Sequence, residues 1–141
     1  TTPTTQAAEQ LYRSSGADDR LDVTLPLGAE AMLNWLPQET ILYDHGRLAR
    51  ALAIEMAASA RLVACEVLVL GRTAHGETVR AGKLADQWRI RRDGRLAYAD
   101  AFRIDADVVA AARGGATLAG GWATASLVMA APDAGDRLDQ V

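Results

Sequence analysis

Hydrophobic and polar residues alternate along much of this chain, and a period of two is typical of β-strands with one buried face. Apolar residues occupy every second position over residues 21–27, and similar alternation resumes over residues 29–35 and 48–56. Pro26 cannot donate a hydrogen bond to a neighbouring strand, so we expect the first strand to lie at a sheet edge or to end there. The pattern predicts a mainly β fold.

A β-hairpin is expected around the Asp-Gly pair at 93–94, because this dipeptide favours tight turns between strands. A two-residue loop would pair Arg92 with Arg95. A three-residue loop that includes the preceding arginine would instead pair Ile90 with Leu96 and gather apolar side chains on one face of the hairpin. Because a slip of one residue turns every side chain over, hydrophobic matching sets the register, and we predict the three-residue loop.

Two segments have the sequence features of short helices. Ser59 can cap the N-terminus of residues 60–70, which are rich in Ala, Leu and Glu, although the Val-Leu-Val-Leu end of this segment fits a strand equally well. Asp107 precedes residues 108–113, and a Gly-Gly pair follows them. We therefore expect one or two short helices beside the strands.

Composition narrows the class of protein. With 141 residues, 50% of them hydrophobic and 23% charged, the chain can bury the core of one globular domain and is neither disordered nor collagen-like. A single cysteine, Cys65, excludes a disulfide framework within the chain and favours a reducing compartment. The sequence starts at Thr1 without Met and without a secretory signal, so we expect these residues to belong to a longer protein.

Charge and hydropathy argue against two classes of function. Residues 46–104 carry eleven Lys or Arg and six Asp or Glu, a net charge of +5, but the whole chain has a net charge of -3 and lacks aromatic residues interleaved for base stacking. The uncharged run over residues 114–132 is long enough to cross a bilayer, yet its glycines and hydroxyl side chains lower its hydrophobicity. We predict neither nucleic-acid binding nor membrane insertion.

The candidate chemistry lies mostly in residues 71–78. Their spacing is close to that of a phosphate-binding loop, but Glu77 stands where such a loop needs lysine, and a carboxylate would repel phosphate. His75 and Glu77 would point the same way from an extended segment and could join His45 or Cys65 as ligands for Ni²⁺ or Zn²⁺. A solvent-exposed loop explains the same residues. Since the motif of a catalytic nucleophile is also absent, we expect no enzymatic activity.

Four segments, in order along the chain, resemble one known family. Residues 35–44 are Trp-Leu-Pro-Gln-Glu-Thr-Ile-Leu-Tyr-Asp, residues 4–14 begin Thr-Thr-Gln-Ala-Ala, residues 66–77 end Gly-Arg-x-Ala-x-Gly-Glu, and residues 92–96 are Arg-Asp-Gly-Arg-Leu. Together they are similar to the motifs of the urease accessory protein UreD family. The resemblance implies partner-binding or structural roles for Trp35, Pro37, Gln38, Glu39, Asp44, Gly71, Arg72, Gly76 and Glu77.

The resemblance also implies a fold and a function. The expected fold is two β-sheets stacked in a helicoidal arrangement with a few helices, in a cytoplasmic protein without catalytic activity. The expected partners are apo-urease and the accessory proteins UreF and UreG, the latter a GTPase, which together insert nickel into urease. The family is longer than this chain, so residues 1–141 are expected to form a single β domain that lacks N- and C-terminal parts. Strand edges at both ends would then be exposed and prone to self-association.

A protein of this kind would hold no tightly bound cofactor and would pass nickel along transiently. Sparse carboxylates suit that role, because a closed set of ligands would retain the ion. The candidates for a nickel route are Glu39, Glu66, His75 and Glu77. Two alternatives stay open. The chain is a generic β-rich protein-interaction module without a metal role, or each carboxylate simply pairs with an arginine such as Arg47, Arg50 or Arg72.

Overall fold

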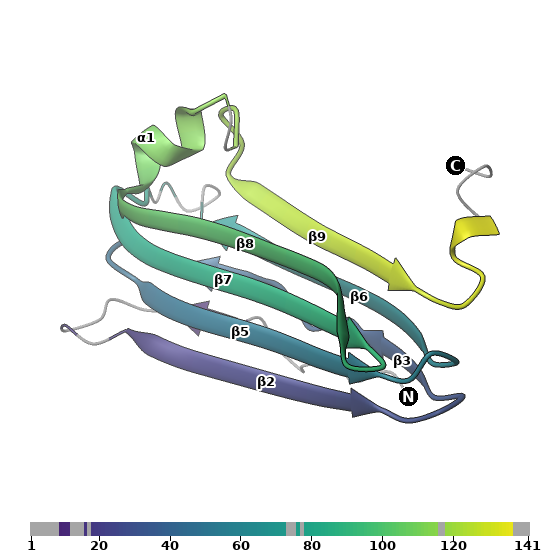
Figure 1. Cartoon of the computed structure of the whole chain (residues 1–141). Coiled ribbons are helices and arrows are strands. Elements are labelled where there is room, and N and C mark those ends of the chain that lie inside the picture. Colours follow the sequence, from purple (N-terminus) through teal and green to yellow (C-terminus); the bar gives the residue numbers. More distant parts are fainter. Residues whose placement is uncertain are drawn as a thin grey trace.

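The computed structural model describes residues 9–11, 16, 18–72, 76, 78–115 and 118–136, which form two β-sheets stacked face to face (Figure 1). One sheet contains β1 (Glu9–Leu11), β3 (Met32–Trp35), β4 (Thr40–Leu42), β6 (Arg61–Leu70) and β9 (Ala123–Ala130). The other contains β2 (Asp19–Leu27), β5 (Arg47–Met56), β7 (Ala81–Arg92) and β8 (Arg95–Asp107). The prediction of a mainly β fold with two sheets is confirmed.

The chain changes sheets after almost every strand, and this path makes the stack helicoidal (Figure 1). It passes from β2 to β3 and β4 in the opposite sheet, returns to β5, crosses to β6 and returns to β7. Successive passes run the same way, so β2, β5 and β7 are parallel, and β3 and β4 lie parallel to the two halves of β6. The helicoidal arrangement implied by the family resemblance is confirmed.

The last two strands depart from this parallel path. β8 returns antiparallel along β7, and β9 pairs antiparallel with β6. Between them, helix α1 (Val108–Arg113) covers one end of the sandwich and buries Val108 and Ala112 (Figure 1). Asp107 caps this helix, since its side chain accepts a hydrogen bond from the Ala110 N–H at 2.8 Å. The predicted short helix after Asp107 is confirmed.

Of the two alternatives for residues 60–70, the strand is correct and the helix is wrong. The segment forms β6, whose side chains alternate between half-buried and buried positions from Arg61 to Leu70. Its valines favour a strand because their branched side chains fit a pleated surface better than a helix. The Ser59 hydroxyl accepts a hydrogen bond from the Glu30 N–H at 3.0 Å and so stabilises a turn between strands.

The β7–β8 hairpin has a two-residue turn, so the predicted three-residue loop is wrong. The turn residues Asp93 and Gly94 have φ angles of 48° and 74°, and the arginines on either side of them pair. A bulge then shifts the register, so that Ile90 pairs with Tyr98 and Leu96 is exposed. The bulge allows a two-residue turn and still places apolar residues on the inner face. The three-residue loop was predicted for that same placement.

Pro26 and the uncharged run over residues 114–132 both lie in or beside regular strands. Pro26 lies in β2, which forms an edge of the four-stranded sheet, as predicted. Most of the uncharged run over residues 114–132 is occupied by β9 and the turns before it. Among the residues that the structure describes, no helix is long and apolar enough to cross a membrane.

Apolar side chains between the sheets form two separate clusters. The cluster beside α1 includes Leu42, Leu48, Leu68, Leu70, Leu84, Ile104 and Val108. The cluster nearer the β7–β8 turn includes Leu27, Leu52, Ile54, Met56, Leu62, Trp88 and Ile90. Both draw residues from the two sheets, so they hold the sheets together at two levels and leave a level between them.

Asp107→Ala should lower the free energy of unfolding by about 1 kcal/mol, because the first turn of α1 loses its side-chain cap. Asp105→Ala is the matched control, since Asp105 is exposed on the same strand and its ion pair with Arg103 is 3.6 Å long. Urea denaturation measures both variants. Equal losses of stability in the two would contradict the capping role.

Candidate functional site

A layer of polar side chains crosses the sandwich between the two apolar clusters. In three strands a charged residue occupies an inward position between apolar neighbours: Arg50 in β5, Glu66 in β6 and Asp86 in β7. Thr40, at the start of β4, reaches the same level and is 2% exposed. We call these four residues the polar layer. The Arg50 and Glu66 side chains are only 6% and 5% exposed, so both are largely buried.

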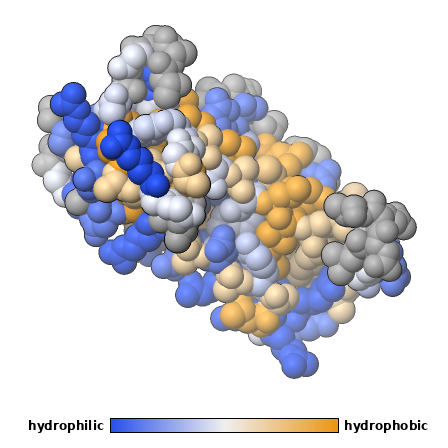
Figure 2. Space-filling view, turned by 90° about the horizontal axis from the view of Figure 1, so that it is seen from above, coloured by the Kyte–Doolittle hydropathy of each residue, from blue (hydrophilic) through white to orange (hydrophobic). Residues whose placement is uncertain are grey.

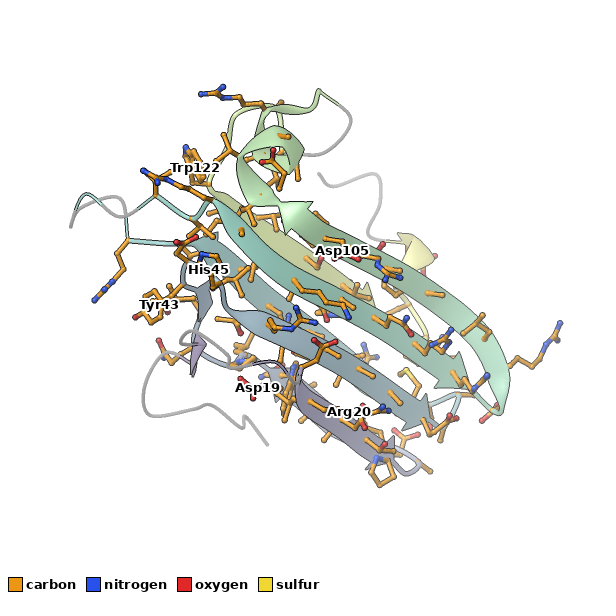
Figure 3. The ribbon with its side chains drawn as sticks, turned by 90° about the vertical axis from the view of Figure 1, so that its left-hand side faces the viewer. Asp19, Arg20, Tyr43, His45, Asp105 and Trp122 are labelled. Atoms are coloured by element: carbon orange, nitrogen blue, oxygen red, sulfur yellow. The ribbon has the colours of Figure 1, made fainter. Side chains whose placement is uncertain are left out.

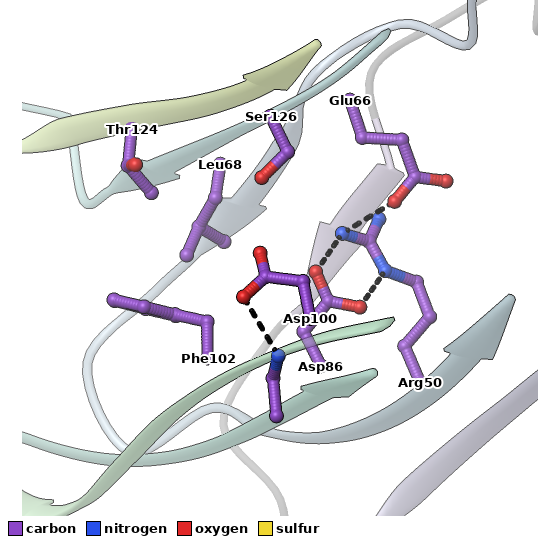
Figure 4. Close-up of a pocket in the computed structure, with 9 residues that line it drawn as sticks. Arg50, Glu66, Leu68, Asp86, Asp100, Phe102, Thr124 and Ser126 are labelled. Atoms are coloured by element: carbon purple, nitrogen blue, oxygen red, sulfur yellow. Dashed lines mark hydrogen bonds and ion pairs between the residues drawn. The ribbon is translucent and has the colours of Figure 1, made fainter. Parts of the chain in front are cut away.

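Arg50 lies at the centre of the polar layer and contacts its three other members. Its Nε and Nη2 donate to the two carboxylate oxygens of Asp86 at 3.0 and 2.6 Å, which makes a bidentate pair (Figure 4). Nη2 also lies 2.9 Å from Glu66 Oε2, and Nη1 donates to Thr40 Oγ1 at 3.1 Å. Arg50 and Asp86 are direct partners in the β5–β7 register, so strand pairing sets the bidentate contact.

Glu66 is also held by two tryptophans. The indole N–H of Trp35 donates to Oε1 at 2.8 Å, and that of Trp88 donates to Oε2 at 3.2 Å. Burial raises the pKa of Glu66, while the charge of Arg50 and the two indole donors oppose that rise. Because two carboxylates face one guanidinium, the polar layer carries net negative charge when all three groups are ionised.

Two cavities reach the polar layer from opposite edges of the sandwich. The β8–β9 cavity, of about 120 Å³, is lined beyond the layer by Leu68, Asp100, Ala101, Phe102, Thr124 and Ser126 (Figure 4). The β2–β3 cavity, of about 300 Å³, is lined beyond the layer by Leu21, Val23, Trp35, Pro37, Gln38 and Leu52. Arg50 and Glu66 line both cavities, so their ion pair lies at the boundary between the two.

The predicted nickel ligands lie in different surroundings. Glu66 belongs to the polar layer, where it pairs with Arg50. Glu39 is half-buried immediately before β4 and is absent from the lining of both cavities. His75 and Glu77 lie outside the described residues. Within the part of the chain that the structure describes, no three His, Cys, Asp or Glu side chains gather in a way that would hold a metal ion.

The motif that runs from Trp35 to Asp44 builds a cavity wall and the loop beside it. Its Trp35, Pro37 and Gln38 line the β2–β3 cavity. At its other end, Asp44 Oδ1 accepts hydrogen bonds from the N–H groups of residues 80 and 81 at 2.8 and 3.1 Å. These bonds join the β4–β5 turn to the start of β7 and so fix the motif relative to the four-stranded sheet.

The Gly-Arg motif after β6 lies at the same end of the sandwich. Gly71 and Gly76 have φ angles of 72° and 70°, which favour glycine. The Arg72 guanidinium carbon lies 4.6 Å from the centre of the Tyr43 ring, a cation–π contact. Figure 3 shows Tyr43 and His45 together at this end, and His45 is exposed. The contact between Arg72 and Tyr43 stabilises the turn that follows β6.

Sequence reasoning missed Asp86 and Asp100 and named Arg50 only as an ion-pair partner. A signal was present, because Arg50 interrupts an inward apolar series between Leu48 and Leu52. Asp86 interrupts the inward series of β7 in the same way. Such breaks predict buried polar groups, but only the stacking of the strands shows that they meet at one level.

Comparison with known proteins identifies the family. The model of the UreD urease accessory protein family matches residues 1–141. The chain is 53% identical over 136 residues to the urease accessory protein UreD of Methylobacterium sp. (strain 4-46), a match that covers 96% of this chain. This chain belongs to the UreD family of urease accessory proteins.

Other UreD proteins match over a similar extent. The urease accessory protein UreD of Magnetococcus marinus is 44% identical over 135 residues, or 96% of this chain, and that of Xanthobacter autotrophicus is 45% identical over 139 residues, or 99%. The chain spans about half the length of these relatives, since the matches cover 47% and 48% of them. The resemblance to the UreD family, drawn from four sequence segments, is confirmed.

Arg50→Met should lower the free energy of unfolding by about 3–5 kcal/mol at pH 7, because Glu66 and Asp86 would remain as buried carboxylates without their cation. The loss should shrink as the pH falls toward 5. Burial already raises the pKa of Glu66, so the native variant takes up a proton at a higher pH than the unfolded chain does. Denaturant titrations across this pH range measure the effect.

Arg47→Met, in the same strand, is the matched control. The Arg47 side chain is 36% exposed and pairs with Asp18 near the surface, so its replacement should cost less than about 1 kcal/mol between pH 5 and 7. A loss in Arg50→Met that is independent of pH, or no larger than that of Arg47→Met, would contradict the buried ion-pair assignment.

Proposed function

We propose that this chain is a UreD-type scaffold that works in the cytoplasm with UreF and UreG to assist nickel insertion into apo-urease. Membership of a urease accessory family supports a role in urease maturation and an accessory rather than a catalytic contribution. Because the chain spans about half the length of its relatives, the proposal concerns the full-length protein, to which these residues contribute the β sandwich.

The polar layer and its two cavities are the observation that carries the nickel proposal. The layer and the β8–β9 cavity supply polar groups at the middle level of an interior whose two ends are apolar clusters, whereas the β2–β3 cavity has mainly apolar walls beyond the layer. On the β8–β9 side, Asp86 and Asp100 supply carboxylates, and Thr124 and Ser126 supply hydroxyls. These oxygen atoms could bind a divalent cation one after another, from the β8–β9 cavity inward to Glu66. Glu66 lies at the boundary between the two cavities.

The arrangement favours passage over storage. Imidazole and thiolate ligands suit Ni²⁺ better than carboxylate oxygens do, so the oxygen ligands of the layer would bind the ion weakly and reversibly. Arg50 pairs with both Glu66 and Asp86, so a cation has to displace the guanidinium in order to use them. The guanidinium then competes to expel the ion. An ion passes through a site quickly only if it binds strongly enough to enter and weakly enough to leave.

One observation favours a second function, a β-rich interaction module without a metal role. Each charged member of the polar layer already has an ion-pair partner, so the layer would serve only to hold the two sheets in register. Under this alternative, changes in the layer alter stability alone, whereas changes on surfaces that face partners abolish urease maturation.

Self-association through strand edges stays a prediction. In the described part of the chain, β8 pairs with β7 along one edge and β9 pairs with β6 along one edge. β8 is 13 residues long and β9 is 8 residues long, so each offers a second edge long enough to pair with another strand.

Asp100→Asn and Glu66→Gln test the nickel route in the full-length protein. Each substitution removes a charge and keeps the side-chain shape, so urease activation at limiting nickel should fall severalfold because the route loses its anionic ligands. Co-purification with UreF and apo-urease should be unchanged. The measurements are the activity and the nickel content of urease purified from cells grown over a range of nickel concentrations.

Glu55→Gln is the matched control, because Glu55 lies on the outer face of the four-stranded sheet, where it pairs with Arg91. It should leave activation unchanged. Full activation of urease by the Asp100→Asn, Glu66→Gln double variant at limiting nickel would overturn the nickel route and favour the interaction module. Normal urease activation after deletion of the whole protein would overturn the role in maturation.

A further inference from the structure

The outer faces of the two sheets differ in character. On the four-stranded sheet, the outward positions of β5, β7 and β8 carry many charged side chains, as expected for a face in contact with water. These residues are Arg47, Glu55, Lys83, Arg89, Arg91, Arg103 and Asp105. On the five-stranded sheet, the outward positions within residues 63–69 and 123–129 carry no charged side chain.

The outer face of the five-stranded sheet is apolar along β6 and β9. Leu127 is 71% exposed, Met129 is 45% exposed, and Met32 on the neighbouring β3 is 58% exposed. Figure 2 shows apolar side chains gathered on the right-hand side of the molecule, where β9 ends in Figure 1. We call this surface the β6–β9 face; its members are Met32, Val63, Cys65, Val67, Val69, Ala123, Ala125, Leu127 and Met129.

An apolar face of this kind is unusual for the solvent-exposed side of a β-sheet. A strand with one wet face alternates apolar and polar residues, whereas β6 is apolar at nearly every position on both of its faces. That composition is typical of strands covered on both sides. Contiguous apolar surface on a folded protein marks an interface, so the β6–β9 face requires an occupant.

We propose that, in the full-length protein, the β6–β9 face is covered by the part of the UreD polypeptide that lies outside residues 1–141. The relatives carry about as many residues again beyond the region that they share with this chain, which is 47–48% of their length. That additional polypeptide is covalently linked to the sandwich, so it covers the face without the entropic cost of bringing in a second molecule. This inference is independent of the nickel route.

The rim of the β6–β9 face carries a held turn and an apolar cavity. After β9 the chain turns, and Asp133 forms an ion pair with Arg61 at the first residue of β6. This ion pair holds the turn after β9 at the rim of the β6–β9 face. At the same rim a cavity of about 140 Å³ offers methionine side chains, which adapt to the shape of an apolar partner. Its lining includes Met32, Asn34, Val63 and Met129.

Cys65 provides a probe, because it is the single cysteine of the sequence and lies half-buried within the face. The experiment uses a full-length UreD chain in which residues 1–141 replace the matching segment of the Methylobacterium relative and other cysteines are removed. Maleimide should label Cys65 at least about tenfold more slowly than it labels an Ala53→Cys, Cys65→Ala variant. Ala53 is the matched position, half-buried on the charged outer face of β5.

Leu127→Asp gives a second readout in the same full-length chain. If the face is covered, this change places a carboxylate in an apolar interface and should lower Tm by roughly 5–10 °C. Leu96→Asp is the matched control, since Leu96 is 54% exposed near the β7–β8 turn, and it should leave Tm nearly unchanged.

Rapid labelling of Cys65 together with an unchanged Tm in Leu127→Asp would overturn the proposal. Protection that appears only at high protein concentration would also overturn it and would assign the face to a second copy of the chain. Protection that appears only when UreF or apo-urease is added would overturn it in favour of a protein partner. None of these outcomes depends on nickel transfer, so the proposed function would stand or fall separately.

Discussion

The pairing of one buried guanidinium with two carboxylates at one level of the sandwich constrains the rest of the structure. A buried carboxylate or guanidinium without a partner costs several kcal/mol. Arg50 meets Asp86 only when β5 and β7 pair in the observed register, and it meets Glu66 only when β6 stacks over the same row. A slip of one residue would turn Arg50 outward and leave both carboxylates buried without their cation. The ion pairs therefore oppose alternative registers that the apolar residues alone would tolerate.

The interior of the sandwich has three levels, which are two apolar clusters and the polar layer between them. The apolar clusters at the two ends hold the sheets together, so the middle level can carry charged groups and cavities without being the main source of stability. The exterior is divided too, into a charged face on the four-stranded sheet and an apolar face along β6 and β9. The polar level suits the route proposed for this chain of the UreD family, and the apolar face suits the proposed interface with the rest of the polypeptide.

Period-two alternation was enough to predict the strands near residues 21–27 and 48–56, because the direction of successive side chains along a strand is a local property. Local chemistry also predicted the Asp107 cap. Composition left a helix and a strand open for residues 60–70, and the packing of β6 within its sheet decides for the strand. The turn residues carry no signal for the β7–β8 bulge. Glu66 could be named from the sequence, but it shares Arg50 with Asp86 only after the chain has crossed between sheets. The roles of His75 and Glu77 stay predictions.

We propose that nickel crosses the sandwich at the polar layer. Anomalous diffraction at the nickel absorption edge, from crystals of the full-length protein soaked in Ni²⁺, tests that claim most directly. Anomalous peaks are expected in the cavities that flank Arg50, beside Asp100 and beside the carboxylates of Glu66 and Asp86. Peaks confined to surface histidines, with both cavities empty at the same nickel concentration, would contradict it.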